Sequence, residues 1–146
     1  MNKTNLKSYY TNIGKHKKLI NKVIPYDNNT CLISDSVSII RLNDNYGLEE
    51  LEDKVMGNYL VKYYDKFENK YDFYTRLYDV LECTEEEYNF KDNWSINMKK
   101  LKKIVKLIKA DVINIVRNEN DYAEYVIHIL NTKTNEHGYL LPCKKY

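Results

Sequence analysis

The sequence has too little glycine to build a phosphate-cradling loop. Four glycines occur among the 146 residues, and neither GxGxxG nor GxxxxGK[ST] can be written from them. The nucleophile elbow GxSxG is also missing, and the three histidines have no metal-ligand partner at a spacing such as HxxxH. We therefore expect no catalytic residues, no metal site and no cofactor, and we predict that the chain is not an enzyme.

Long apolar runs and paired cysteines are absent as well. No apolar run approaches the roughly 18 residues that a membrane-spanning helix needs, and no signal-peptide segment opens the chain. Cys31, Cys83 and Cys143 form no CxxC pair, and any disulfide scheme would leave one thiol over. We expect a protein of the reducing cytoplasm that has no membrane partner.

The overall charge of +2 conceals an uneven distribution along the chain. Residues 1–46 hold seven basic and three acidic side chains, residues 47–92 hold six and thirteen, and residues 93–146 hold ten and five. The three segments therefore carry +4, −7 and +5. Two basic ends flank an acidic centre, and such asymmetry bears on the choice of partner rather than on the fold.

The strongest periodic pattern is a lysine-rich segment at residues 94–109. Its apolar residues recur at steps of four and three, which predicts a helix with one buried face and Ser95 as the N-cap. These apolar residues are Trp94, Met98, Leu101, Val105 and Ile108. The remaining arc carries no acid, and its lysines are Lys99, Lys100, Lys102, Lys103, Lys106 and Lys109. Leu107 lies among these lysines, so we expect it to be exposed or to contact something outside the main core of the helix.

This lysine arc has two interpretations. A helix with one buried face usually presents charge to solvent, and the lysines then only solvate it. Six lysines without an interleaved acid also fit contact with phosphates or with an acidic partner. Lysine in place of arginine argues against bidentate reading of base edges, so sequence-specific recognition is not expected.

Strand patterns follow the lysine-rich helix. Residues 112–116, 122–130 and 139–141 are rich in β-branched or aromatic side chains, and polar turns separate them. Pro142 lacks an amide donor and is expected at a strand end. His128 alternates with Ile127 and Ile129, so we expect it to face solvent or to be satisfied by hydrogen bonds rather than to bind a metal.

The beginning of the chain repeats this order of elements. A short helix is predicted over residues 4–13, and strands are predicted over 19–26, 31–33 and 37–42. Asp27, Asn28 and Asn29 tolerate positive φ and predict a hairpin turn. The sequence therefore predicts a single α+β domain made of two helix-plus-three-strand units, residues 1–46 and 94–146, around an inserted segment at 47–93.

The inserted segment is acidic and aromatic. Leu48, Leu51, Val55 and Tyr59 suggest a short acidic helix, and an apolar pattern over residues 71–81 suggests a second one. The tyrosines of the segment fit packing against the sheet. They also fit an interaction surface, because tyrosine is enriched at interfaces; the candidates for partner contact are Tyr63, Tyr64, Tyr71 and Tyr74.

Two parts of the sequence resemble the sliding-clamp family. ISDS at residues 33–36, leading into VSIIRL at 37–42, is similar to the TDG-x-x-A strand pair of clamp-like proteins. The lysine-rich helix followed by VINIV at 112–116, YVI at 125–127 and GYLLP at 138–142 resembles the end of a bacterial DNA polymerase processivity clamp. The resemblance covers residues 1–46 and 93–146, and the central segment departs from the family pattern.

The resemblance implies paired helix-plus-strand units whose helices line a basic inner face against DNA. It also implies a small protein of phage or mobile-element type in the bacterial host cytoplasm. One such domain could close a ring only as a symmetric homo-oligomer. Family membership supports a fold more than an activity.

Two functions from different classes follow. The first is a non-enzymatic interaction protein that engages DNA without sequence specificity, or engages a DNA-processing assembly. Its contact residues would be Lys99, Lys102, Lys103, Lys106 and Lys109. The alternative is an anti-CRISPR-like phage inhibitor that uses the acidic aromatic centre to bind a host nucleic-acid-binding protein such as an antiviral nuclease. A purely self-assembling module is a third option.

Overall fold

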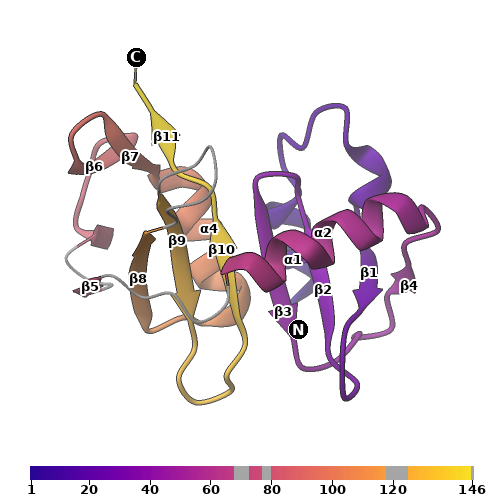
Figure 1. The fold of residues 1–146 in the computed structure, drawn as a ribbon. Coiled ribbons are helices and arrows are strands. Elements are labelled where there is room, and N and C mark those ends of the chain that lie inside the picture. The colour runs from indigo at the N-terminus through magenta and orange to yellow at the C-terminus, as the bar shows by residue number, and fades with distance from the viewer. Residues whose placement is uncertain (68–72, 77–79, 118–124, 146) are drawn as a thin grey trace.

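The computed structural model describes residues 1–67, 80–117 and 125–145 and the backbone of 73–76. The fold is α+β, as predicted (Figure 1). In chain order the described elements are α1 (Lys3–Tyr9), the 3₁₀ turn η1 (Lys17–Leu19), β1 (Lys22–Pro25), β2 (Cys31–Ser34), β3 (Ser38–Leu42), β4 (Glu49–Glu50), α2 (Lys54–Phe67), β5 (Phe73–Arg76), β6 (Glu87–Lys91), β7 (Trp94–Asn97), α4 (Met98–Ile108), β8 (Val112–Arg117), β9 (Tyr125–Leu130), β10 (His137–Leu140) and β11 (Cys143–Lys144).

One large sheet joins the two predicted units. Its strand order is β4-β1-β2-β3-β10-β9-β8-β5, and its neighbours are antiparallel except for the parallel pair β1–β4. The third strand of the first unit, β3, pairs with the third strand of the second, β10, so the two meanders meet at the middle of the sheet (Figure 1). A smaller sheet of order β11-β7-β6 combines two strands of the second unit with β6 of the inserted segment.

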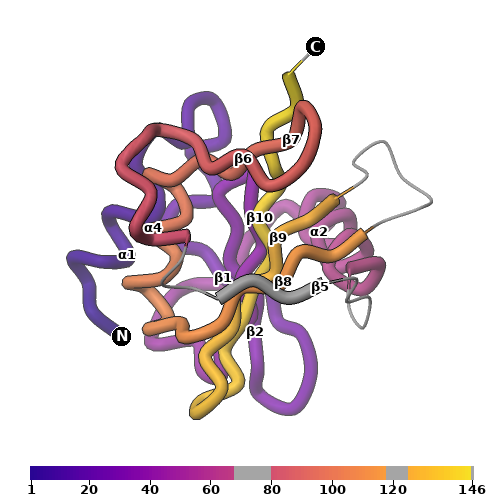
Figure 2. The backbone as a smooth tube through the Cα atoms, turned by 90° about the vertical axis from the view of Figure 1, so that its left-hand side faces the viewer, coloured from indigo at the N-terminus to yellow at the C-terminus, as the bar shows by residue number. Residues whose placement is uncertain are grey.

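Helices cover both faces of the large sheet. Figure 2 shows α1 and α4 on one side of the strands and α2 on the other. Adjacent residues of a strand point to opposite faces, so Leu32 packs towards α2 whereas Ile33 packs towards α1 and α4. Because both faces are covered, both residues are fully buried. This explains why the strands read as continuous apolar runs rather than as alternating ones.

Several sequence predictions are confirmed. The helix, strand, strand, strand order holds in both units, and the predicted strand at 112–116 is β8. The hairpin turn at 27–29 is present, because Asn28 and Asn29 have φ of 42° and 67° and the amide of Thr30 donates to the carbonyl of Asp27 over 2.7 Å. Strand β10 ends two residues before Pro142.

The start of the lysine-rich helix is predicted wrongly. Residues 94–97 form β7, which pairs with β6 and β11 and buries Trp94, Ser95 and Ile96. The N-cap is Asn97, whose side-chain oxygen accepts the amide of Lys100 over 3.0 Å. Trp94 falls on the helical stripe by coincidence, since its burial comes from the small sheet.

The buried face of α4 also differs from the predicted stripe. Val105 is only half-buried, whereas Leu107 is 7% exposed and belongs to the core between the helices and the sheet. The prediction that Leu107 is exposed or lies outside the main core is therefore wrong. The neighbouring helix α1 broadens the buried arc, because it covers α4 from one side.

The central segment folds differently from its prediction. The first helix is α2, which begins after Asp53, and the side-chain oxygen of Asp53 accepts the amide of Met56 over 3.0 Å. Val55 and Tyr59 are 82% and 59% exposed, so they do not form its buried face. Within the predicted second helix, Phe73–Arg76 is strand β5, because β8 supplies its backbone partners. None of the described helices has the length and apolar character needed to cross a bilayer.

Gly138 lies at the junction of the two units, where it pairs with Ile40 of β3. A Cβ added there would lie 2.3 Å from Ile40 Cδ1 and 2.6 Å from the carbonyl oxygen of Ile39. Gly138→Ala is expected to lower the free energy of unfolding by about 2 to 3 kcal/mol or more, because the backbone of β3 must move. Gly57→Ala on α2 is the matched control, since its nearest neighbour lies 3.7 Å away and alanine favours helix. Urea unfolding measures both variants, and equal midpoints would contradict this account.

Candidate nucleic-acid interface

Helices α1 and α4 lie side by side on one face of the sheet (Figure 2). Leu6 and Tyr9 of α1 and Leu101 and Ile104 of α4 point into the same core. The side-chain amide of Asn5 donates to the carbonyl of Lys106 over 3.3 Å and ties the two helices together at their surface. The remaining sides of both helices face away from the sheet.

These outward sides carry lysines and no acid. Of the outward lysines at 99–109, four are exposed and one, Lys103, is half-buried. We call this surface the α1–α4 face, and its lysines are Lys99, Lys102, Lys103, Lys106 and Lys109. These are the five lysines predicted as contact residues. Lys3 and Lys7 of α1 are also exposed, but they line a separate hollow with Ile20 and Leu48.

The lysines of the α1–α4 face form no salt bridge within the described residues. Salt bridges among those residues use other lysines, such as Lys18 with Asp53 and Lys22 with Glu49. The exception on α4 is Lys100, which points inward and pairs with Asp35. The electropositive surface therefore excludes Lys100 and consists of the other five lysines of residues 99–109.

Lys100 and Asp35 form a buried link between the two units. Asp35 lies in the β2–β3 turn and is 2% exposed. One of its oxygens accepts from the amides of Val37 (3.1 Å) and Ser38 (2.9 Å) and from the Ser38 hydroxyl (2.7 Å), and the other faces the Lys100 ammonium. Lys100 also donates to the carbonyl of Tyr9 over 2.8 Å. Asp35 thus holds the first turn of α4 against the first unit.

The four candidate tyrosines lie in different environments. Tyr64 is fully buried between α2 and the sheet, so its assignment to partner contact is wrong. Tyr63 is half-buried, and its hydroxyl lies 3.0 Å from that of the exposed Tyr59. Tyr71 lies outside the described residues, and of Tyr74 only the backbone is described, in β5.

A chain of buried hydrogen bonds runs under α2. The Asn114 side-chain amide donates to His128 Nδ1 over 3.1 Å, His128 Nε2 lies 2.8 Å from His137 Nδ1, and His137 Nε2 lies 2.7 Å from the Tyr64 hydroxyl. Because an amide nitrogen only donates, each imidazole accepts at Nδ1 and carries its hydrogen on Nε2. Both imidazoles are therefore neutral.

The surroundings of the two histidines favour this neutral state. Burial, followed by the neighbouring His137, lowers the pKa of His128 to about 3, and burial, followed by Arg41, lowers the pKa of His137 to about 4. His128 is satisfied by hydrogen bonds, which is one of the two predicted outcomes. The pairing of His128 with His137 was not predicted, although the register of the β9–β10 hairpin puts both on one face of the sheet.

Comparisons with known proteins identify no family for this chain. No family model, curated protein or solved structure matches the chain. Within the described part of the chain, no three His, Cys, Asp or Glu side chains are grouped so that they could hold a metal ion. The three cysteines are free.

Proposed function

We propose that this protein binds the phosphate backbone of nucleic acid through the α1–α4 face, without sequence specificity and without a catalytic step. The observation that carries the proposal is the set of outward lysines along α4, on a surface where neither α4 nor the neighbouring α1 holds an acid and where these lysines form no salt bridge among the described residues. Lysines in this arrangement attract polyanions, because binding releases the counterions condensed on the phosphates.

The dimensions of α4 suit this role. Lys99 and Lys109 are ten residues apart, which is about 15 Å along a helix axis. That length corresponds to roughly four base-pair steps of duplex DNA. Lysine ammonium groups act as point charges, so they position the protein on the backbone and leave base edges unread.

The resemblance to sliding clamps supports the same proposal. In that family the helices face DNA and the strands form the outside, and here α1 and α4 share one face of the sheet. The chain departs from the family in the helix α2, which covers the opposite face. A closed ring would require several copies, and solution mass measurement tests that extension separately.

Reversing two charges of the α1–α4 face tests the proposal. Lys102→Glu with Lys106→Glu is expected to weaken binding to a 20-base-pair duplex by at least about tenfold and to reduce the salt slope by about 2, since two phosphate contacts are lost. Lys54→Glu with Lys62→Glu on α2 makes the same charge change on the other face of the sheet and is expected to change affinity far less. Fluorescence anisotropy across a series of salt concentrations measures both.

Two results would overturn the proposal. One is duplex binding that weakens equally in the two double variants, since the net charge alone would then explain it. The other is no binding to DNA at low salt, in which case the alternative partner, a host nucleic-acid-binding protein, becomes the better candidate.

A further inference from the structure

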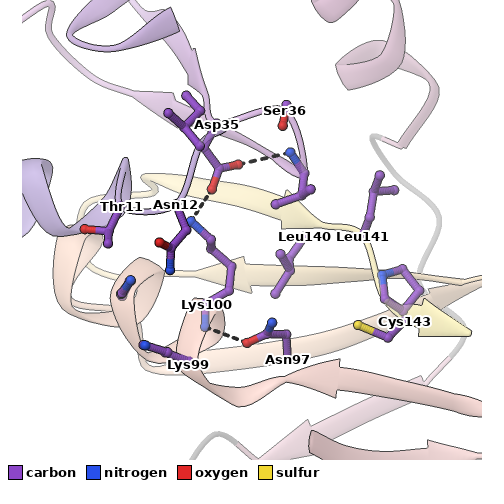
Figure 3. A pocket seen from close by; sticks show the side chains of 14 residues that line it. Thr11, Asn12, Asp35, Ser36, Asn97, Lys99, Lys100, Leu140, Leu141 and Cys143 are labelled. Atoms are coloured by element: carbon purple, nitrogen blue, oxygen red, sulfur yellow. Dashed lines mark hydrogen bonds and ion pairs between the residues drawn. The ribbon is translucent and has the colours of Figure 1, made fainter. Parts of the chain in front are cut away.

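A cleft of about 400 Å³ opens at the N-terminal end of α4. Its walls come from the residues that follow α1, the β2–β3 turn, the first turns of α4 and residues 140–143 (Figure 3). Four segments far apart in sequence therefore meet around it. Its volume lies in the range of small-molecule sites, about 300 to 1,000 Å³.

One side of the cleft is basic. Lys99, Lys100 and Lys103 line it, and Asp35 is its single carboxylate. Asp35 forms its ion pair with Lys100, and Lys99 and Lys103 form no salt bridge among the described residues. The pKa of Lys103 is lowered by burial and then by repulsion from Lys100 and Lys99, and the attraction of Asp35 only partly offsets this, so an anion placed here would relieve crowding of like charge.

The first turn of α4 adds to this field. A helix N-terminus carries a partial positive charge, which favours an anion there. Asn97 lines the cleft and accepts the amide of Lys100, and the amide of Met98 donates to the carbonyl of Glu86 over 2.9 Å. The helix end therefore adds to the field of the lysines through its dipole rather than through these two amides.

The other side of the cleft is apolar. Val37, Leu141 and Pro142 line it, and Val37 is 42% exposed, which is unusual for a large aliphatic side chain in this protein. Figure 3 shows Leu140, Leu141 and Cys143 on the side opposite Thr11 and Lys99. A ligand that filled the cleft would contact apolar surface at one end and ammonium groups at the other.

We propose that this cleft binds a phosphate monoester with a flat apolar body, of the class of nucleoside monophosphates. A phosphate monoester carries close to two negative charges at neutral pH, which matches two ammonium groups that form no salt bridge better than a carboxylate does. The apolar side favours an ester over inorganic phosphate. The inference shares Lys99 and Lys103 with the α1–α4 face, but it does not require that the protein bind duplex DNA.

Isothermal titration calorimetry tests the cleft directly. Adenosine 5′-monophosphate is expected to bind at least about tenfold more tightly than adenosine or inorganic phosphate, because only the monophosphate uses both sides. Lys103→Met is expected to weaken its binding about tenfold or more, through loss of one charge-assisted contact. Lys106→Met removes the same charge from α4 outside the cleft and is expected to leave this affinity within about twofold.

A second pair of variants keeps every lysine in place. Val37→Glu puts a carboxylate at the mouth of the cleft and is expected to weaken monophosphate binding about tenfold relative to Val37→Gln, which has the same size and no charge. No heat with millimolar adenosine 5′-monophosphate, or equal losses in Lys103→Met and Lys106→Met, would overturn the proposal. Lys106→Met is expected to weaken duplex binding only, so failure of the cleft and failure of the α1–α4 face remain distinguishable.

Discussion

Asp35→Ala is expected to lower the free energy of unfolding by about 3 to 5 kcal/mol. The change leaves the Lys100 ammonium, whose side chain is 13% exposed, without its counter-charge. It also removes the acceptor for two amides and for the Ser38 hydroxyl. Because Asp35 belongs to the first unit and Lys100 to the second, the loss falls on the junction between them.

An exposed ion pair supplies the control for this prediction. Asp27 lies 3.4 Å from Arg41 and its side chain is 58% exposed, so Asp27→Ala is expected to cost no more than about 1 kcal/mol. Adding Lys100→Met to Asp35→Ala is expected to restore part of the stability, since the unpaired buried charge is removed. Urea unfolding measures all of these variants. Equal losses for Asp35→Ala and Asp27→Ala would contradict the buried-link interpretation.

Acidification is expected to destabilise the protein through His128 and His137. Their pKa values in the folded state are lowered to about 3 and about 4, whereas an unfolded histidine titrates near 6.5. Below pH 6.5 the unfolded chain therefore binds more protons than the folded one, and stability falls as pH falls. Between pH 6.5 and 4.5 the two histidines together account for a loss of about 4 kcal/mol.

Two variants distinguish the contribution of the histidines to the loss of stability in acid from that of the carboxylates, which also titrate in acid. His137→Gln stays neutral at every pH, so the slope of unfolding free energy against pH is expected to fall by about half. His16→Gln is the control, because it changes the same residue type outside the hydrogen-bond chain, and equal slopes for the two variants would contradict the role of the buried pair. NMR titration gives an independent measure, since the ring signals of His128 and His137 are expected to stay constant from pH 8 to 5. Ring signals that titrate near pH 6.5 would contradict the neutral chain.

Local patterns in the sequence predicted most of the second unit. The strand at 112–116 and the body of the lysine-rich helix depend on side-chain periodicity, which neighbouring residues carry within a few turns. The hairpin turn at 27–29 depends on residues that tolerate positive φ, which is also a local property. Errors arose where a remote strand decided the outcome: β7 pairs with β6 and β11, and β5 pairs with β8.

The candidate sites divide in the same way. The lysines of α4 follow from the sequence, because a helix with one apolar side must put its charges on the other. The partnership of Lys100 with Asp35 joins residues 65 positions apart, and the burial of Tyr64 depends on α2 lying across the sheet. Neither the Lys100–Asp35 pair nor the burial of Tyr64 can be predicted from residues that are close together in the sequence.

Side-chain periodicity and turn residues were enough to predict the α+β class, the helix-plus-strand order and the acid-free lysines of the second helix. Which lysine is buried and which tyrosine is covered depended on the packing of distant segments. Periodicity and turn chemistry act between neighbours along the chain, whereas burial and charge pairing depend on which remote segments the sheet brings into contact.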